Sequence, residues 1–398
     1  MNNNGQVSDK GSAYGIKDLA IPVYLPSLLF SIGEAGLLPI IPASAESLGA
    51  DIPTAGVIAG LVMLGTLIAD LPAGLVVDRF GERRAMIGAS IVATLGILFS
   101  VFATNIYVLG LGILIIGMTV SVFALARHSF IAEQVAFSHR ARALSLLGGM
   151  YRGGAFIGPL IGAGLVASFG VMSVYWLAVI FCGLAAIVLL ATKPEKVRRK
   201  PRRASGAIWK VVKDERHKFF TVGLAASSLG IVRASRTIGL PLWALYIGLD
   251  PALAALYIGI AGALDFALFY SSGQVMDKFG RRWAAIPTLI GMGITHMLVG
   301  LALDSTSFLA VALLMAFANG IGSGVILVIG ADLAPSNKRN EFLSAYRLLI
   351  DSGVAATPMV LAGLTVVIGL AGSMTVIGAI AIGGAAVLWR WLPKFGIR

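Results

Sequence analysis

Seven ionisable residues lie within long apolar stretches of this 398-residue chain, where a charge is costly. Burial favours the neutral form of a carboxylate, whereas a nearby arginine favours its ionised form, so such groups can take up and release protons. Arginines can also hold an anionic organic molecule. We expect these seven to line a proton-coupling or substrate cavity: Glu34, Asp70, Arg152, Arg233, Arg236, Asp265 and Asp351.

An internal repeat relates several of these charges. Half of 398 is 199, and a shift by 199 places Glu34 on Arg233 and Arg152 on Asp351. The same shift superimposes other residues in register, among them Pro42 on Pro241, Gly60 on Gly259, Asp78 on Asp277, Arg140 on Arg339 and Pro159 on Pro358. Such a repeat indicates a duplicated unit.

The paired charges allow two interpretations. If they face each other across a central cavity, closing a Glu34–Arg233 contact would release a proton and opening it would bind one. Glu34, helped by Asp70 or Asp265, would then couple inward proton flow to outward movement of a substrate. The alternative is that the pairs are fixed salt bridges that hold the two halves together.

The elements that carry these residues are predicted to be membrane-spanning helices. Hydrophobic residues make up 58% of the chain and charged ones only 13%, whereas a soluble domain carries roughly a quarter charged residues. We therefore predict an all-α polytopic membrane protein with twelve transmembrane helices in two pseudo-symmetric six-helix bundles. The crossings begin near Leu19, Ala55, Ala85, Ile106, Ala143, Val171, Phe219, Ala252, Ala284, Ser307, Phe342 and Ala371.

Charge placement predicts the orientation. Between Lys193 and Lys218, eleven basic residues stand against three acidic ones, so much of the net charge of +12 lies in one loop between apolar blocks. A basic loop beside an anionic leaflet explains it better than nucleic acid does. We predict a multi-pass protein of the cell membrane with both termini cytoplasmic. The expected parts are a tail at 1–18, bundles at 19–192 and 219–392, a basic linker at 193–218 and a tail at 393–398.

Several kinds of chemistry lack residue support. Cys182 is the only cysteine, which excludes internal disulfides and thiolate clusters. The chain has no phosphate-binding loop, no His-Glu-x-x-His pattern and no Gly-x-Ser-x-Gly pattern. We therefore expect no enzyme activity, no metal and no cofactor. The expected partners are membrane lipids, a small-molecule substrate and protons, and the chain is expected to be a monomer.

Two basic loops occupy the same place in each half of the chain. They contain Gly74, Asp78, Arg79, Gly81, Arg83 and Arg84 in one half and Gly273, Asp277, Lys278, Gly280, Arg281 and Arg282 in the other. These loops resemble the signature loop of the major facilitator superfamily. The resemblance implies a cytoplasmic latch between the halves, with the aspartate facing the start of helix eleven. It also implies that the arginines face an acid that ends helix four, which is Glu133 here and Asp332 in the repeat. The alternative is a basic loop that only sets topology.

A glycine ladder in helix five resembles the antiporter motif of the same superfamily. It contains Gly154, Gly158, Pro159 and Gly162, and Ala163 stands where a final glycine is usual. The motif favours export, although small residues four apart also serve simple close packing. Ile113 stands where helix four of proton-coupled exporters usually carries an arginine, and Arg127 is expected at the interface.

The parallel repeat and these motifs predict a secondary transporter that works by alternating access, most like the drug:proton antiporter group. The expected activity is proton-coupled efflux of a small amphipathic or charged organic compound. One alternative is an importer or facilitator of a nutrient or organic anion. Another is a membrane receptor or scaffold that transports nothing.

Overall fold

The computed structural model describes residues 15–192, 206–335 and 338–397. The predicted N-terminal tail lies mostly outside the described residues, as does the first half of the predicted basic linker. In the first half of the chain, two short turns at Lys17–Leu19 and Ala20–Tyr24 lead into the helices. These are α1 (Leu25–Leu37), α2 (Ile41–Ser47), α3 (Ile52–Phe80), α4 (Glu82–Val101), α5 (Ile106–Gln134), α6 (Phe137–Phe169) and α7 (Met172–Ala191).

The second half repeats this pattern after two short helices that carry several basic residues. Its helices are α8 (Gly206–Asp214), α9 (Arg216–Lys218), α10 (Leu224–Tyr246), α11 (Pro251–Phe279), α12 (Arg282–Leu298), α13 (Ser305–Ile321), α14 (Val325–Leu333) and α15 (Arg339–Trp391). A π-type turn at Phe219–Gly223 precedes α10, and 3-10 turns follow α12 and α15 at Val299–Leu301 and Pro393–Phe395.

The helices account for twelve crossings. Ten helices of the described residues are long and apolar enough to span a membrane. One of them is α15, which Gly369 (φ 73°) bends into two arms, so it crosses twice. The ten do not include α10, because Arg233 and Arg236 lower its apolarity. With α10 and the second arm of α15 the count is twelve, and the predicted fold class is confirmed.

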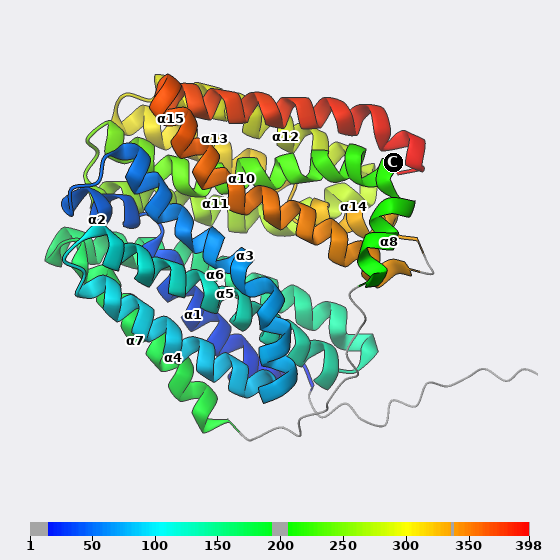
Figure 1. Ribbon diagram of the computed structural model, residues 1–398, viewed down its shortest axis with the longest axis horizontal. Coiled ribbons are helices and arrows are strands. Elements are labelled where there is room, and N and C mark those ends of the chain that lie inside the picture. The colour runs from blue at the N-terminus through cyan, green and yellow to red at the C-terminus, as the bar shows by residue number, and fades with distance from the viewer. Residues whose placement is uncertain (1–14, 193–205, 336–337, 398) are drawn as a thin grey trace, which may run out of the picture.

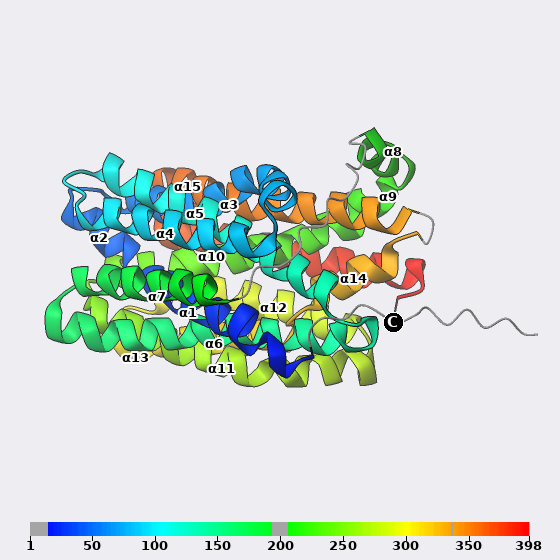
Figure 2. The same cartoon turned by 90° about the horizontal axis from the view of Figure 1, so that it is seen from below.

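The helices form two groups that run along one common direction (Figures 1 and 2). Figure 1 shows most of α1–α7 below and α10–α15 above. We call these groups the N lobe and the C lobe. They meet along two seams, one between α3 and α15 and one between α6 and α11. We call these the first seam and the second seam.

The two ends of the bundle differ in charge. The α3–α4 and α11–α12 loops, with Arg83 and Arg281, lie at the end that also carries α8 and the C-terminus (Figure 1). We call this end the basic face. At the opposite face Asp51, Asp250 and Asp304 cap α3, α11 and α13 by accepting hydrogen bonds from backbone N–H groups. Each cap satisfies donors that a helix N-terminus would otherwise leave free.

One part of the predicted linker differs from the expected loop. Residues 206–214 form α8, which packs against α15. Val211 is buried, while Trp209 and Lys210 are exposed, so one face of the helix is anchored. Asp214 accepts a hydrogen bond of 2.7 Å from Lys338, and this bond holds the pKa of Asp214 below its usual range. An apolar stripe at helical spacing therefore folds this segment despite its charge.

Candidate functional site

Glycines fix the position of α1, the helix that carries Glu34. A Cβ on Gly158 would lie 2.7 Å from the Gly36 nitrogen, so α6 and α1 approach each other backbone to backbone. Gly154 sits equally close to Ser31, whose hydroxyl donates a hydrogen bond of 2.9 Å to the Tyr151 carbonyl. The glycines of the helix-five motif thus allow close packing of two helices in this structure. It holds the Glu34 helix against α6.

Glu34 faces the space between the lobes. Its side chain is 8% exposed and lines two adjoining cavities of about 260 and 210 Å³. Tyr151 and Thr237 also line both cavities, and these two residues come from different lobes. Within the part of the chain that the structure describes, Glu34 makes no hydrogen bond. The carboxyl group is therefore available to a proton or a bound molecule.

Arg127 corrects a prediction made from the sequence, since its side chain is buried within the protein and does not extend outward toward the membrane interface. It is 7% exposed, and its guanidinium lies over the rings of Phe123 and Tyr151, at 5.8 and 5.3 Å from their centroids. Its positive charge interacts with Glu34. Its Nε has no hydrogen-bond partner among the described residues. One signal in the sequence could have indicated this inward position, namely an arginine on an otherwise apolar helix.

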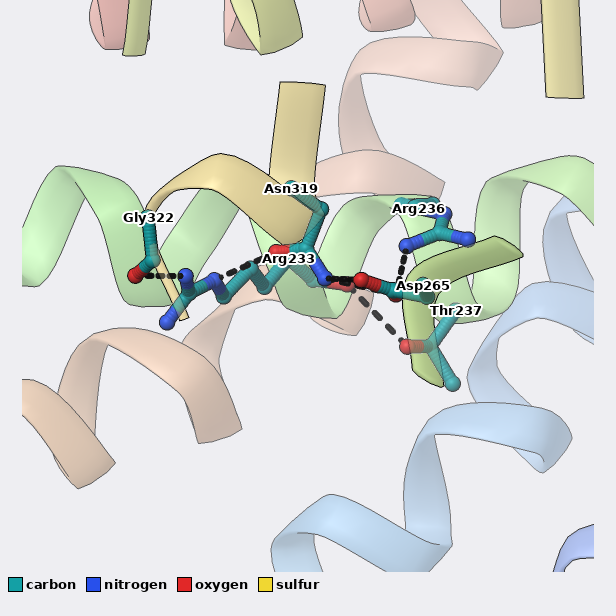
Figure 3. A network of polar contacts seen from close by, with 6 residues as sticks. All are labelled: Arg233, Arg236, Thr237, Asp265, Asn319 and Gly322. Carbon is teal, nitrogen blue, oxygen red and sulfur yellow. Dashed lines mark hydrogen bonds and ion pairs between the residues drawn. The ribbon is translucent and has the colours of Figure 1, made fainter. Parts of the chain in front are cut away.

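A polar network in the C lobe holds three of the seven predicted residues (Figure 3). Arg236 donates a hydrogen bond of 2.7 Å to Asp265, which also accepts two from the Asn319 amide at 2.9 and 2.7 Å. Arg233 donates to the Asn319 Oδ1 at 2.7 Å and to the Gly322 carbonyl at 2.9 Å. In this conformation Arg233 therefore bonds within its own lobe and not to Glu34. Asn319 was not predicted.

The second predicted charge pair is also apart. Arg152 lies 4.5 Å from the centroid of the Phe269 ring, on the other lobe. Asp351 accepts a hydrogen bond of 3.2 Å from Arg347, one turn before it on α15. The Asp70 carboxylate accepts a hydrogen bond from the Ser121 hydroxyl and lines the larger interlobe cavity with Asp351. Of the seven residues, Glu34, Asp70 and Asp351 line the larger cavity and Glu34, Arg236 and Asp265 line the smaller one, so five of the seven line the two cavities.

The two basic loops have the predicted turns. Gly81 and Gly280 adopt φ values of 82° and 96°, which favour glycine. Arg281 forms an ion pair of 2.8 Å with Asp332, as the repeat predicts. Arg83 donates to the Leu189 and Leu190 carbonyls at the end of α7.

The predicted latch between the lobes is not engaged in this conformation. Asp78 and Asp277 are exposed, and neither bonds to a residue that the structure describes. Arg79 and Arg84 are also exposed, and Arg282 lies over the Trp389 ring within its own lobe. A separate cavity of about 510 Å³ lies beside the second loop at the basic face, lined by Asp277, Lys278, Arg281, Asp332 and residues 395–397.

Glycine contacts show which end of the bundle is closed. Toward the opposite face, a Cβ on Gly60 would collide with Pro358, and one on Gly259 would collide with Leu160 across the second seam. Toward the basic face, Gly74 and Gly273 have no described atom within 4 Å of an added Cβ. The lobes therefore touch toward the opposite face and separate toward the basic face.

Two lobes of membrane-spanning helices around a charged cavity, open at one end, define a membrane transporter and not an enzyme. Residues 23–278 match the family model of the Major Facilitator Superfamily. The chain belongs to this superfamily.

Relatives and solved structures agree with this assignment. The chain is 25% identical over 298 residues to the multi-drug resistance efflux pump PmrA of Streptococcus pneumoniae, and the aligned region covers 73% of this chain and 74% of the pump. It is 24% identical over 340 residues to the multidrug resistance protein MdtH of Cronobacter sakazakii, covering 83% and 82%. A crystal structure of a POT family transporter in complex with a thioalcohol-conjugated peptide superimposes with a TM-score of 0.79 at 13% identity, covering 95% and 96%.

Proposed function

We propose that this transporter exports a small amphipathic or charged organic compound in exchange for protons, by alternating access. The observation that carries the proposal is Glu34, a buried carboxyl group that faces the cavity between the lobes and has no hydrogen bond to any described residue. A carboxyl group in a poorly solvated site tends to keep its proton, whereas a positive charge beside it, such as that of Arg127 or of a bound cationic substrate, favours ionisation. Proton binding and substrate binding would then exclude each other at one site.

Further observations support export. Two relatives at low identity are named for drug resistance: PmrA as a multi-drug resistance efflux pump and MdtH as a multidrug resistance protein. The cavity wall combines apolar residues such as Leu38, Val62 and Ile238 with a few charged ones, which suits an amphipathic molecule.

The orientation and the moving units belong to the same proposal. The basic face, with both described loops of lysines and arginines, would face the cytoplasm of the cell membrane, because short basic loops are translocated poorly. Residues 19–192 and 219–392 would move as two units joined by the linker 193–218. The structure then represents a state open to the cytoplasm, and the chain would work as a monomer.

One observation favours the alternative of an organic-anion carrier. Asp265 accepts a hydrogen bond from Arg236 and two from Asn319. The charge of the same carboxylate also acts on Arg233 and Arg152. Three arginines, two from the C lobe and Arg152 from the N lobe, surround one aspartate and leave an excess of positive charge between the lobes. A transported anion could neutralise this excess.

Transport assays in proteoliposomes test the proposal. We expect an acidic lumen to drive uptake of ethidium, a lipophilic cation, by the wild type, and Glu34→Gln to abolish this uptake. Glu46→Gln removes a carboxylate at an exposed position and should leave uptake unchanged. A Glu34→Gln variant with undiminished gradient-driven transport would remove Glu34 from the coupling step. Uptake of an organic anion such as benzoate in place of ethidium would favour the alternative.

A further inference from the structure

The first seam carries two carboxylates that face each other across the lobes. Gly60 of α3 packs against Pro358 of α15 toward the opposite face. Further toward the basic face the same two helices bring Asp70 and Asp351 into one cavity, where their like charges interact. Arg347 bonds to Asp351 from its own helix, but its side chain is 70% exposed. Closing this seam would bring the two carboxylates together.

The second seam has the opposite chemistry at the same two positions. The 199-residue shift carries Asp70 onto Phe269 and Asp351 onto Arg152. These two residues already form a cation–π contact of 4.5 Å across the lobes. A cation over an aromatic ring is an attractive contact that needs no proton. Only the first seam therefore resists closure when its residues are ionised.

We propose that Asp70 and Asp351 form a proton-binding site shared by the two lobes, and that closing the basic face requires them to share one proton. This inference rests on the proposed alternating access, and it adds a second proton site to that of Glu34. Two ionised carboxylates brought together repel each other, whereas one proton from water at the open face neutralises one of them and allows a hydrogen bond between the two. Opening of the face would release that proton.

Few other charges face this pair. Glu34 from α1 and Tyr151 from α6 look onto the same cavity, and Arg347 lies on α15 itself. From α5, Ser121 bonds to Asp70, and the charges of Arg127 and Arg347 both act on His128. Arg233 and Arg236 of α10 and Asp265 of α11 bond within the C-lobe network. Glu34 is a third acid that lines this cavity, buried and without a hydrogen bond to a described residue, so the test must separate it from the pair.

Distances between spin labels on the two lobes test the proposal without substrate or gradient. Labels go on Leu146→Cys of α6 and Leu348→Cys of α15, which are 39% and 44% exposed, in a Cys182→Ala background. For the otherwise wild-type protein in nanodiscs, we expect the label distance to shorten as pH falls from about 9 to about 5. Asp70→Asn should give the short distance across this range, and Asp351→Asn should do the same.

Two control variants separate the pair from its surroundings. Phe269→Leu removes the aromatic contact at the equivalent place on the second seam, and Glu34→Gln removes the other cavity acid. Both should keep the pH-dependent shift. A wild-type distance independent of pH, or a shift that persists in both aspartate variants, would overturn the shared site. A transport assay that contradicted export would leave this result untouched, because the distances depend on neither substrate nor direction.

Discussion

Gly158 of α6 and Gly36 of α1 pack backbone against backbone, and this contact fixes the helix that carries Glu34. A Cβ on Gly158 would lie 2.5 Å from the Ile32 carbonyl oxygen and 2.7 Å from the Gly36 nitrogen. Backbone atoms cannot move aside as a flexible side chain can. The motif that resembles an antiporter signature therefore has a structural role here, because it holds α1 against α6.

We predict that Gly158→Ala separates α6 from α1 and lowers the melting temperature. Overpacking of this kind costs about 1–3 kcal/mol, and displacement of Glu34 should reduce transport as well. Gly164→Ala is the matched control on the same helix, because an added Cβ there meets no described atom within 4 Å. Thermal unfolding in detergent and proteoliposome transport measure both effects. Equal melting temperatures for the two variants would contradict the packing role.

The apolar pattern was sufficient to predict the twelve crossings, because a membrane core demands about 20 apolar residues per helix. The turns at Gly81 and Gly280 followed from local sequence in the same way. Contacts between side chains could not be predicted from local sequence. The repeat indicated that Glu34 and Arg233 lie at equivalent depth, but depth does not determine which way a side chain points. Arg233 donates a hydrogen bond to Asn319, an uncharged residue that could not be predicted by pairing opposite charges.

Arg127 escaped prediction for a related reason. Its position near one end of α5 is compatible with a side chain that reaches the interface. Whether the side chain turns inward depends on the helix rotation and on the rings of Phe123 and Tyr151, which only the packed structure defines.

The helix caps at the opposite face give a pH-dependent prediction. Hydrogen bonds from Ser307 and Thr306 hold the pKa of Asp304 below its usual value. A lowered folded-state pKa means that Asp304 stabilises the fold above its unfolded-state pKa of about 3.9, and that this stabilisation is lost as pH falls through the lower folded-state pKa. Asp304→Ala should therefore lower the melting temperature at pH 7, with a smaller difference near pH 3. Asp304→Asn keeps an acceptor and should retain more of the stability at pH 7. A deficit of Asp304→Ala independent of pH would contradict this account.

The C-lobe network predicts strong coupling between Arg236 and Asp265. Asp265→Asn removes the only carboxylate that accepts hydrogen bonds from Arg236 and Asn319 among the described residues. We expect a marked fall in melting temperature, because Arg236 is left buried without its partner. Adding Arg236→Gln should recover part of the loss, with a coupling of about 0.5–3 kcal/mol.

The control for this network is Asp250→Asn, the same chemical change at an exposed helix cap where asparagine also serves. It should be close to neutral in the same unfolding measurement. Additive effects of Asp265→Asn and Arg236→Gln would show that the two side chains do not depend on each other.

Arg127 and Glu34 make the strongest prediction about coupling. Arg127→Met leaves Glu34 buried without its opposite charge, so Glu34 should hold its proton and gradient-driven transport should be lost. The double variant Glu34→Gln, Arg127→Met removes both charges and should not regain coupling. Arg127→Lys retains the charge and should keep partial transport with a shifted pH profile. An unchanged pH profile in Arg127→Met would show that Glu34 titrates independently of this arginine.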